Sequence, residues 1–104
     1  MDFKQAAALA TAWVEIVCDG KVRIVRPSTI AKPYGWIFFY QSNEFLENGV
    51  ASSQLAGSAS IIINRNSGEL RVTGTARALE DYLEKYEGTL SPAALQQTPQ
   101  PPIW

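Results

Sequence analysis

The sequence contains no histidine and a single cysteine among its 104 residues. Without histidine, the chain lacks the side chain that titrates near neutral pH and is the commonest metal ligand. Cys18 has no second cysteine for a disulfide and no histidine to activate it as a nucleophile. It follows an apolar helical stretch, where a buried and unreactive thiol is expected. We therefore predict no catalytic residue, no metal site and no cofactor.

Long hydrophobic runs are absent as well. No stretch approaches the roughly 20 continuous apolar residues of a membrane span. The N-terminus shows no basic leader before an apolar run. A net charge of −1 argues against nucleic acid as the main partner. We expect a cytoplasmic chain that binds neither membrane nor nucleic acid.

Two further patterns argue against an enzyme. Gly68 and Gly74 are isolated glycines, so the chain has no phosphate-cradling loop. Glu80 and Glu84 share one exposed face of a predicted helix, where separate solvation of two carboxylates is far commoner than catalysis. With histidine absent too, a binding protein is the better interpretation.

The pattern of apolar residues predicts both helices and strands. Apolar residues recur at helical spacing from residue 3 to 17, after Asp2 and Gln5, which fit a capping box. Residues 21–26 alternate as a strand does and are interrupted by Pro27. Residues 35–41 form an aromatic strand, residues 60–64 and 69–74 form a hairpin with Gly68 in its turn, and residues 79–86 form a second helix.

This order predicts an α+β fold with two layers. An antiparallel sheet of about four strands would carry the N-terminal and the C-terminal helix on one face. The domain would span residues 1–88, followed by a Pro-rich C-terminal tail over residues 89–104. Ile103 and Trp104 give the tail an apolar end that either docks on the domain or frays, and we favour fraying slightly.

Several segments of the chain resemble one known family. They are Gly35-Trp36-Ile37-Phe38-Phe39-Tyr40-Gln41-Ser42, Leu55-Ala56-Gly57, the turn through Arg65 and Gly68, and Gly74-Thr75-Ala76-Arg77-Ala78-Leu79-Glu80-Asp81-Tyr82-Leu83-Glu84-Lys85-Tyr86. Between about residues 3 and 87, the chain is similar to the immunity protein 35 family, also called the YrhB-like domain. The resemblance implies a bacterial protein of a polymorphic toxin system that binds and neutralises a toxin made beside it. It implies no catalytic residue.

The aromatic strand raises the question of what covers it. In an extended chain Trp36, Phe38 and Tyr40 point to one face, while Ile37 and Phe39 point to the other. The first three rings are either part of the core, or covered by the long connection and Trp104, or an interface that a partner covers. The residues leave these alternatives nearly even, and the family resemblance favours the interface.

An outward aromatic face would lie among arginines, a composition typical of a binding hot spot. The long connection over residues 42–59 adds candidates, because such connections often carry binding roles. The predicted partner-binding residues are Trp36, Phe38, Tyr40, Arg23, Arg71, Glu44 and Phe45.

Three hypotheses of function follow. The first is an immunity protein that covers the active surface of a cognate protein toxin. The alternative is a YrhB-like chaperone, or holdase, that binds unfolded clients, since a YrhB-like member is associated with chaperone-like activity. A homodimer paired through the aromatic face is compatible with either.

Overall fold

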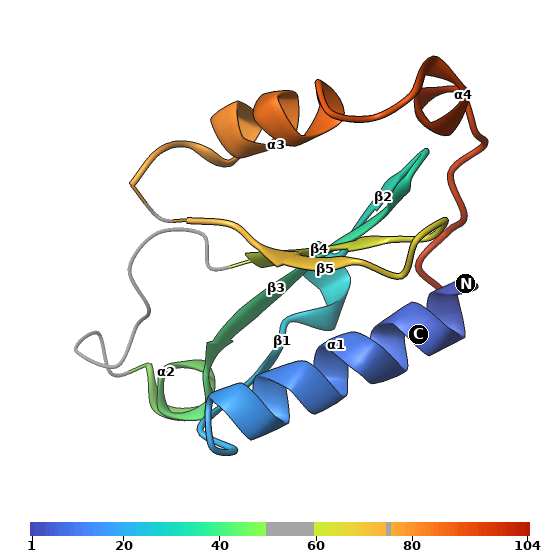
Figure 1. The fold of residues 1–104 in the computed structure, drawn as a ribbon. Helices are drawn as coiled ribbons and strands as arrows, with labels where there is room; N and C mark the ends of the chain where they lie inside the picture. Colours follow the sequence, from blue (N-terminus) through green and yellow to red (C-terminus); the bar gives the residue numbers. More distant parts are fainter. Residues whose placement is uncertain (50–59, 75) are drawn as a thin grey trace.

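The computed structural model describes residues 1–49, 60–74 and 76–104. Figure 1 shows three layers, with one helix above the sheet and a longer one below it. In chain order the elements are α1 (Phe3–Val17), β1 (Val22–Ile24), the 3-10 turn η1 (Arg26–Ser28), β2 (Ile30–Lys32), β3 (Gly35–Ser42), α2 (Asn43–Asn48), β4 (Ser60–Asn64), β5 (Leu70–Val72), α3 (Leu79–Glu87) and α4 (Pro92–Leu95). Within these described residues, no helix combines the length and apolar character that crossing a membrane requires.

The start of α1 is fixed by the predicted capping box. The Asp2 carboxylate accepts a hydrogen bond from the Gln5 backbone N–H at 2.9 Å. In return, the Gln5 side-chain oxygen accepts one from the Asp2 N–H at 2.9 Å. These two bonds satisfy donors that a helix end otherwise leaves unpaired, which confirms the predicted start.

The sheet is antiparallel and is organised around β3. One side of β3 pairs with β4 along residues 35–39, and the other side pairs with β2 at its start and with β1 at its end. Pro27 lies in η1 between β1 and β2, so the predicted break divides one edge into two short strands. At the start of β3, a Cβ atom on Gly35 would collide with the Ile63 carbonyl oxygen, so this close pairing requires glycine.

The α+β class is confirmed, with five strands among the described residues, but the prediction that both helices lie on one face is wrong. Trp36 and Phe38 pack under α1 in one core, while Ile37 packs under α3 in a second. The two helices therefore cover opposite faces of the sheet (Figure 1). The physical reason is that β3 is apolar on both faces, so each face needs its own cover.

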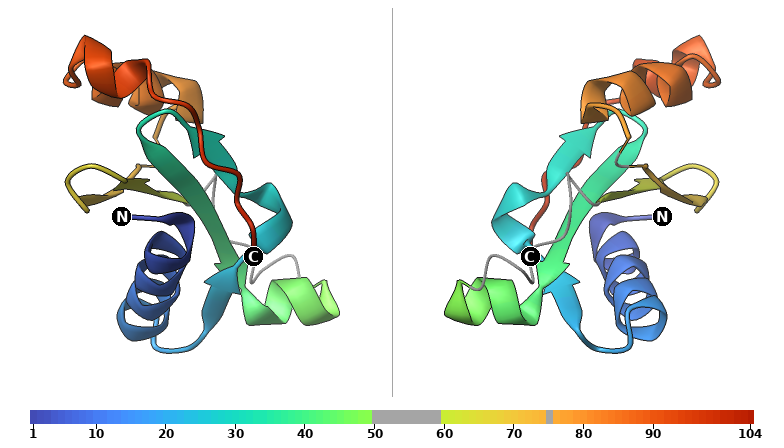
Figure 2. Two further views of the ribbon diagram at one scale, coloured as in Figure 1. Left: turned by 90° about the vertical axis from the view of Figure 1, so that its right-hand side faces the viewer. Right: turned by 90° about the vertical axis from the view of Figure 1, so that its left-hand side faces the viewer.

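The C-terminal tail docks on the domain, so the prediction of a frayed end is wrong. The Trp104 ring meets Phe3 and Phe38 edge to face, with centroid distances of 5.2 Å and 5.8 Å. The Trp36 indole N–H donates to the Gln100 carbonyl at 2.9 Å, and the Arg65 guanidinium donates to the Thr98 carbonyl at 2.6 Å. Figure 2 shows the tail descending from α4 across the strands toward η1.

Trp104→Ala should lower the free energy of unfolding by roughly 1–3 kcal/mol, because it removes a partly buried ring from the Phe3 and Phe38 contacts. Urea unfolding followed by circular dichroism measures this change. Ile103→Ala is the matched control: its side chain is 71% exposed, so we expect a change within about 0.5 kcal/mol. Equal stability of the Trp104→Ala variant and the unchanged chain would contradict the docked tail.

Candidate functional site

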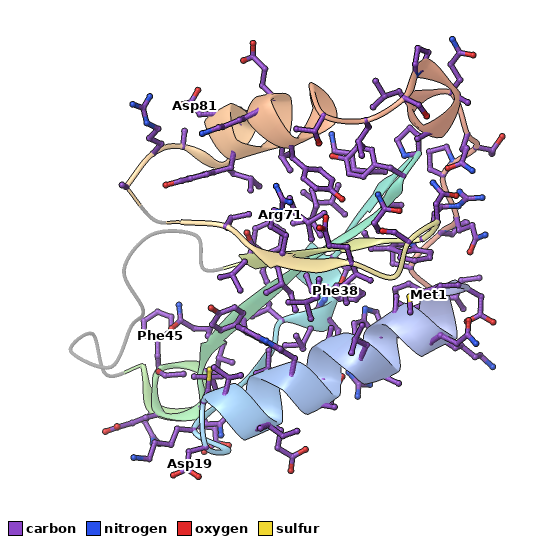
Figure 3. The ribbon with its side chains drawn as sticks, viewed as in Figure 1. Met1, Asp19, Phe38, Phe45, Arg71 and Asp81 are labelled. Carbon is purple, nitrogen blue, oxygen red and sulfur yellow. The ribbon has the colours of Figure 1, made fainter. Side chains whose placement is uncertain are left out.

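The structure places two of the predicted partner-binding residues in the core. Trp36 and Phe38 have no exposed surface, so the expectation that they face outward is wrong. Figure 3 shows Phe38 between the sheet and α1. Tyr40 is half-buried against Trp13, with ring centroids 6.1 Å apart. Burial, followed by an electrostatic contribution from the nearby Cys18, raises the pKa of Tyr40.

Arg23 on β1 lies beside α2, the short helix that carries Glu44 and Phe45. The Ser42 hydroxyl accepts from the Phe45 N–H at 3.1 Å and so begins α2 directly after β3. Arg23 on β1 reaches α2 through a 3.0 Å ion pair with Glu47. We call this region the α2 surface, made up of Arg23, Glu44, Phe45, Leu46 and Glu47.

A hollow of about 370 Å³ between α1 and β1 adjoins the α2 surface. Its lining includes Arg23, Glu15 and Asn43, the first residue of α2. The Asn43 amide donates to the Gly20 carbonyl at 2.9 Å. Its Oδ1 atom is buried and has no hydrogen-bond partner among the residues that the structure describes. An unpaired buried acceptor costs free energy that a donor from a ligand or partner can recover.

Exposed apolar side chains gather at the same end of the molecule. Ile16 and Val17 are exposed in the last turn of α1, and Leu46 is partly exposed on α2. Figure 2 shows α1 and α2 on either side of β1 at this end. Apolar groups beside an arginine and a polar hollow have the composition of a protein interface.

Arg71 belongs to a different surface on the opposite edge of the sheet, because the strand order runs β1-β3-β4-β5. Its guanidinium lies 5.2 Å from the centre of the Tyr86 ring and pairs with Glu69 at 3.3 Å. The Tyr86 hydroxyl donates to Glu69 at 3.4 Å and accepts from the Asn64 amide at 3.1 Å. These residues line a hollow of about 580 Å³ beside α4. Arg23 and Arg71 therefore do not form one contact patch.

Sequence reasoning missed Glu47, Asn64 and Tyr86. Asn64 ends an apolar strand just before a turn, and its side-chain oxygen accepts the N–H groups of Asn66 and Ser67. A polar residue in that position is a recognisable turn signal. By contrast, the pairing of Glu47 with Arg23 and of Tyr86 with Arg71 depends on packing between elements far apart in sequence.

The described surfaces offer groups suited to recognition. Among the described residues, no three His, Cys, Asp or Glu side chains lie close enough to hold a metal ion. The hydroxyl of the buried Tyr34 donates to Glu87 at 2.8 Å, and this pair joins the turn before β3 to the end of α3. Burial and then the Glu87 carboxylate raise the pKa of Tyr34, which keeps the phenol protonated as a donor.

The fold and these surfaces define a small α+β domain whose exposed features are those of a binding protein. The chain belongs to the Immunity protein 35 family, whose model matches residues 4–87. It is also similar to an uncharacterized protein of Escherichia coli (strain K12), YrhB, with 49% identity over 53 residues. That match covers 51% of this chain and 56% of YrhB, so the chain spans little more than half of that relative's length. No solved structure matches the chain.

The raised pKa of Tyr34 predicts a loss of stability at alkaline pH. Its pKa in the folded state lies above the value of about 10 in the unfolded chain, so its contribution is complete below pH 10 and is lost as the pH rises beyond that value. Tyr34→Phe should cost about 1 kcal/mol at pH 8 by removing the bond to Glu87. It should also make the decline in stability from pH 10 upward shallower.

Urea midpoints measured across that pH range provide the test. An equally steep alkaline decline in the Tyr34→Phe variant would mean that this phenol is not the group responsible.

Proposed function

We propose that this protein is an immunity protein that binds one cognate toxin and neutralises it by covering the toxin's active surface. Membership of the Immunity protein 35 family supports the toxin-immunity role. The observation that carries the mode of action is the α2 surface. At this surface and the adjoining hollow, an arginine, a buried acceptor with no partner among the described residues, and exposed apolar side chains lie at one end of the sheet. A protein that inhibits by occlusion needs a shaped contact surface and no chemistry of its own.

The α2 surface has the balance of groups expected for one specific partner. Arg23 is held by Glu47 in an orientation that leaves about half of its side chain exposed. Phe45 and Leu46 supply partly exposed apolar area on the same short helix as Glu47. Arginine with aromatic and aliphatic neighbours is the composition in which a few residues carry most of the binding energy. Tyr40 and Trp13 support this end from beneath, since both are half-buried.

The position of the α2 surface is suited to occlusion. It lies on the β1 edge, which β2 and η1 continue, and Ser42 fixes α2 to the last residue of the central strand. Because β3 is buried on both faces, α2 is attached to a strand that is packed on both sides. A preorganised surface loses little conformational entropy when a partner covers it.

Co-expression with the product of the adjacent gene tests the proposed function. If that product is the cognate toxin, the chain should restore growth of cells that make it, and the two proteins should co-purify. Arg23→Glu and Leu46→Ala should each weaken the complex by roughly tenfold or more, because both remove contacts at the proposed centre. Isothermal titration calorimetry measures the dissociation constants.

Two matched controls separate contact from stability. Arg77→Glu reverses an exposed arginine next to α3, and Leu95→Ala truncates a leucine that, like Leu46, is 37% exposed. Both controls should bind as the unchanged chain does. Absence of both rescue and complex would sink the immunity proposal. A complex that tolerates the α2 variants but not the controls would place the toxin on another surface.

A further inference from the structure

The outer edge of β5 is open to strand pairing. The Asn64 N–H donates to the Glu69 carbonyl at 2.9 Å, and the Thr73 N–H donates to the Ser60 carbonyl at 3.1 Å. In an antiparallel ladder, residues alternate between bonding to one neighbour and to the other. Glu69, Arg71 and Thr73 therefore point their backbone groups at β4, and Leu70 and Val72 point theirs outward. Within the described part of the chain, no strand pairs with this edge.

The two sides of β5 differ in character. Leu70 and Val72 face the α1 side with their paired residues Ile63 and Ile61, and Val72 is 49% exposed. Glu69 and Arg71 face the α3 side and are about half exposed. Figure 1 shows β5 at the front of the sheet with α1 below and α3 above, and in Figure 2 the hairpin projects to the side opposite η1. Neither helix lies across the edge in these views.

We propose that this edge pairs with the same edge of a second copy of the chain, with the two β5 strands antiparallel and Leu70 opposite Leu70. In this register each Glu69 lies opposite the Arg71 of the other copy. Each Val72 lies opposite the other copy's Gly68, which has no side chain and is approached by the Met1 methyl group. The outward N–H and C=O groups of Leu70 pair with each other across the two-fold axis.

The charges on β5 favour a second copy of the chain as the partner at this edge, and they favour the register centred on Leu70. If the two-fold axis passed through Arg71, the Arg71 side chains of the two copies would lie opposite each other, and this like-charge contact is unfavourable. Centring the pair on Leu70 produces two Glu69–Arg71 pairs, in addition to the 3.3 Å pair within each chain. Tyr86 lies beneath each guanidinium at 5.2 Å and limits its orientation. The dimer leaves the α2 surface free, because β1 and β5 are opposite edges of the sheet.

Charge reversal provides the test, with analytical ultracentrifugation over a range of protein concentrations. The unchanged chain should shift from monomer to dimer as its concentration rises. Glu69→Arg and Arg71→Glu should each raise the dissociation constant roughly tenfold, because each creates two like-charge pairs. The double variant should restore pairing, and an equimolar mixture of the two single variants should form a heterodimer. Circular dichroism confirms that each variant is folded.

Hydrogen exchange on the unchanged chain gives a second readout that needs no variant. The Leu70 and Val72 amides should exchange quickly in dilute solution and become protected as the concentration rises, while Thr73 is protected throughout. A monomer at every concentration would overturn the proposal. A dimer whose dissociation constant does not change in either single variant would also overturn it. The same holds if neither the mixture of single variants nor the double variant restores association.

Discussion

Burial of β3 on both faces is the constraint on which the rest of the structure depends. Trp36 and Phe38 on one face and Ile37 on the other are all fully buried, so the sheet needs a helix on each side. This sandwich fixes α1 and α3, and through Ser42 and Tyr34 it also positions α2 and the end of α3. The surfaces available to a partner then include the two edges of the sheet, together with the outward faces and the ends of the helices.

The C-terminal tail completes this arrangement. The Trp36 indole N–H is buried and needs an acceptor, which the Gln100 carbonyl supplies. The Trp104 ring closes the end of the same core against Phe3 and Phe38, and Arg26 lies 5.0 Å from the centre of that ring. Both contacts come from residues outside the region that matches the family model, which ends at residue 87. In this chain the tail therefore performs part of the packing of the family domain.

Local patterns predicted the elements well, because caps, turns and alternation act over a few residues. Asp2 with Gln5, Pro27 and Gly68 each produced the predicted feature. The face of the sheet covered by each helix could not be predicted, since strand alternation gives two faces without saying what packs on either. For the same reason, the prediction that Trp36 faces a partner was wrong. Arg23 and Arg71 were predicted to share one binding surface because the sequence alone does not show that β1 and β5 are opposite edges of the sheet.

The most direct test of the account is the exchange rate of the Trp36 indole N–H, measured by NMR in the unchanged chain and in a chain lacking residues 97–104. If the aromatic face is core sealed by the tail, this proton exchanges slowly in the full chain and much faster in the shortened one. Slow exchange in both chains would show that the tail does not seal it. Fast exchange in the full chain would contradict burial of the aromatic face and would support the alternative that this face is an exposed interface.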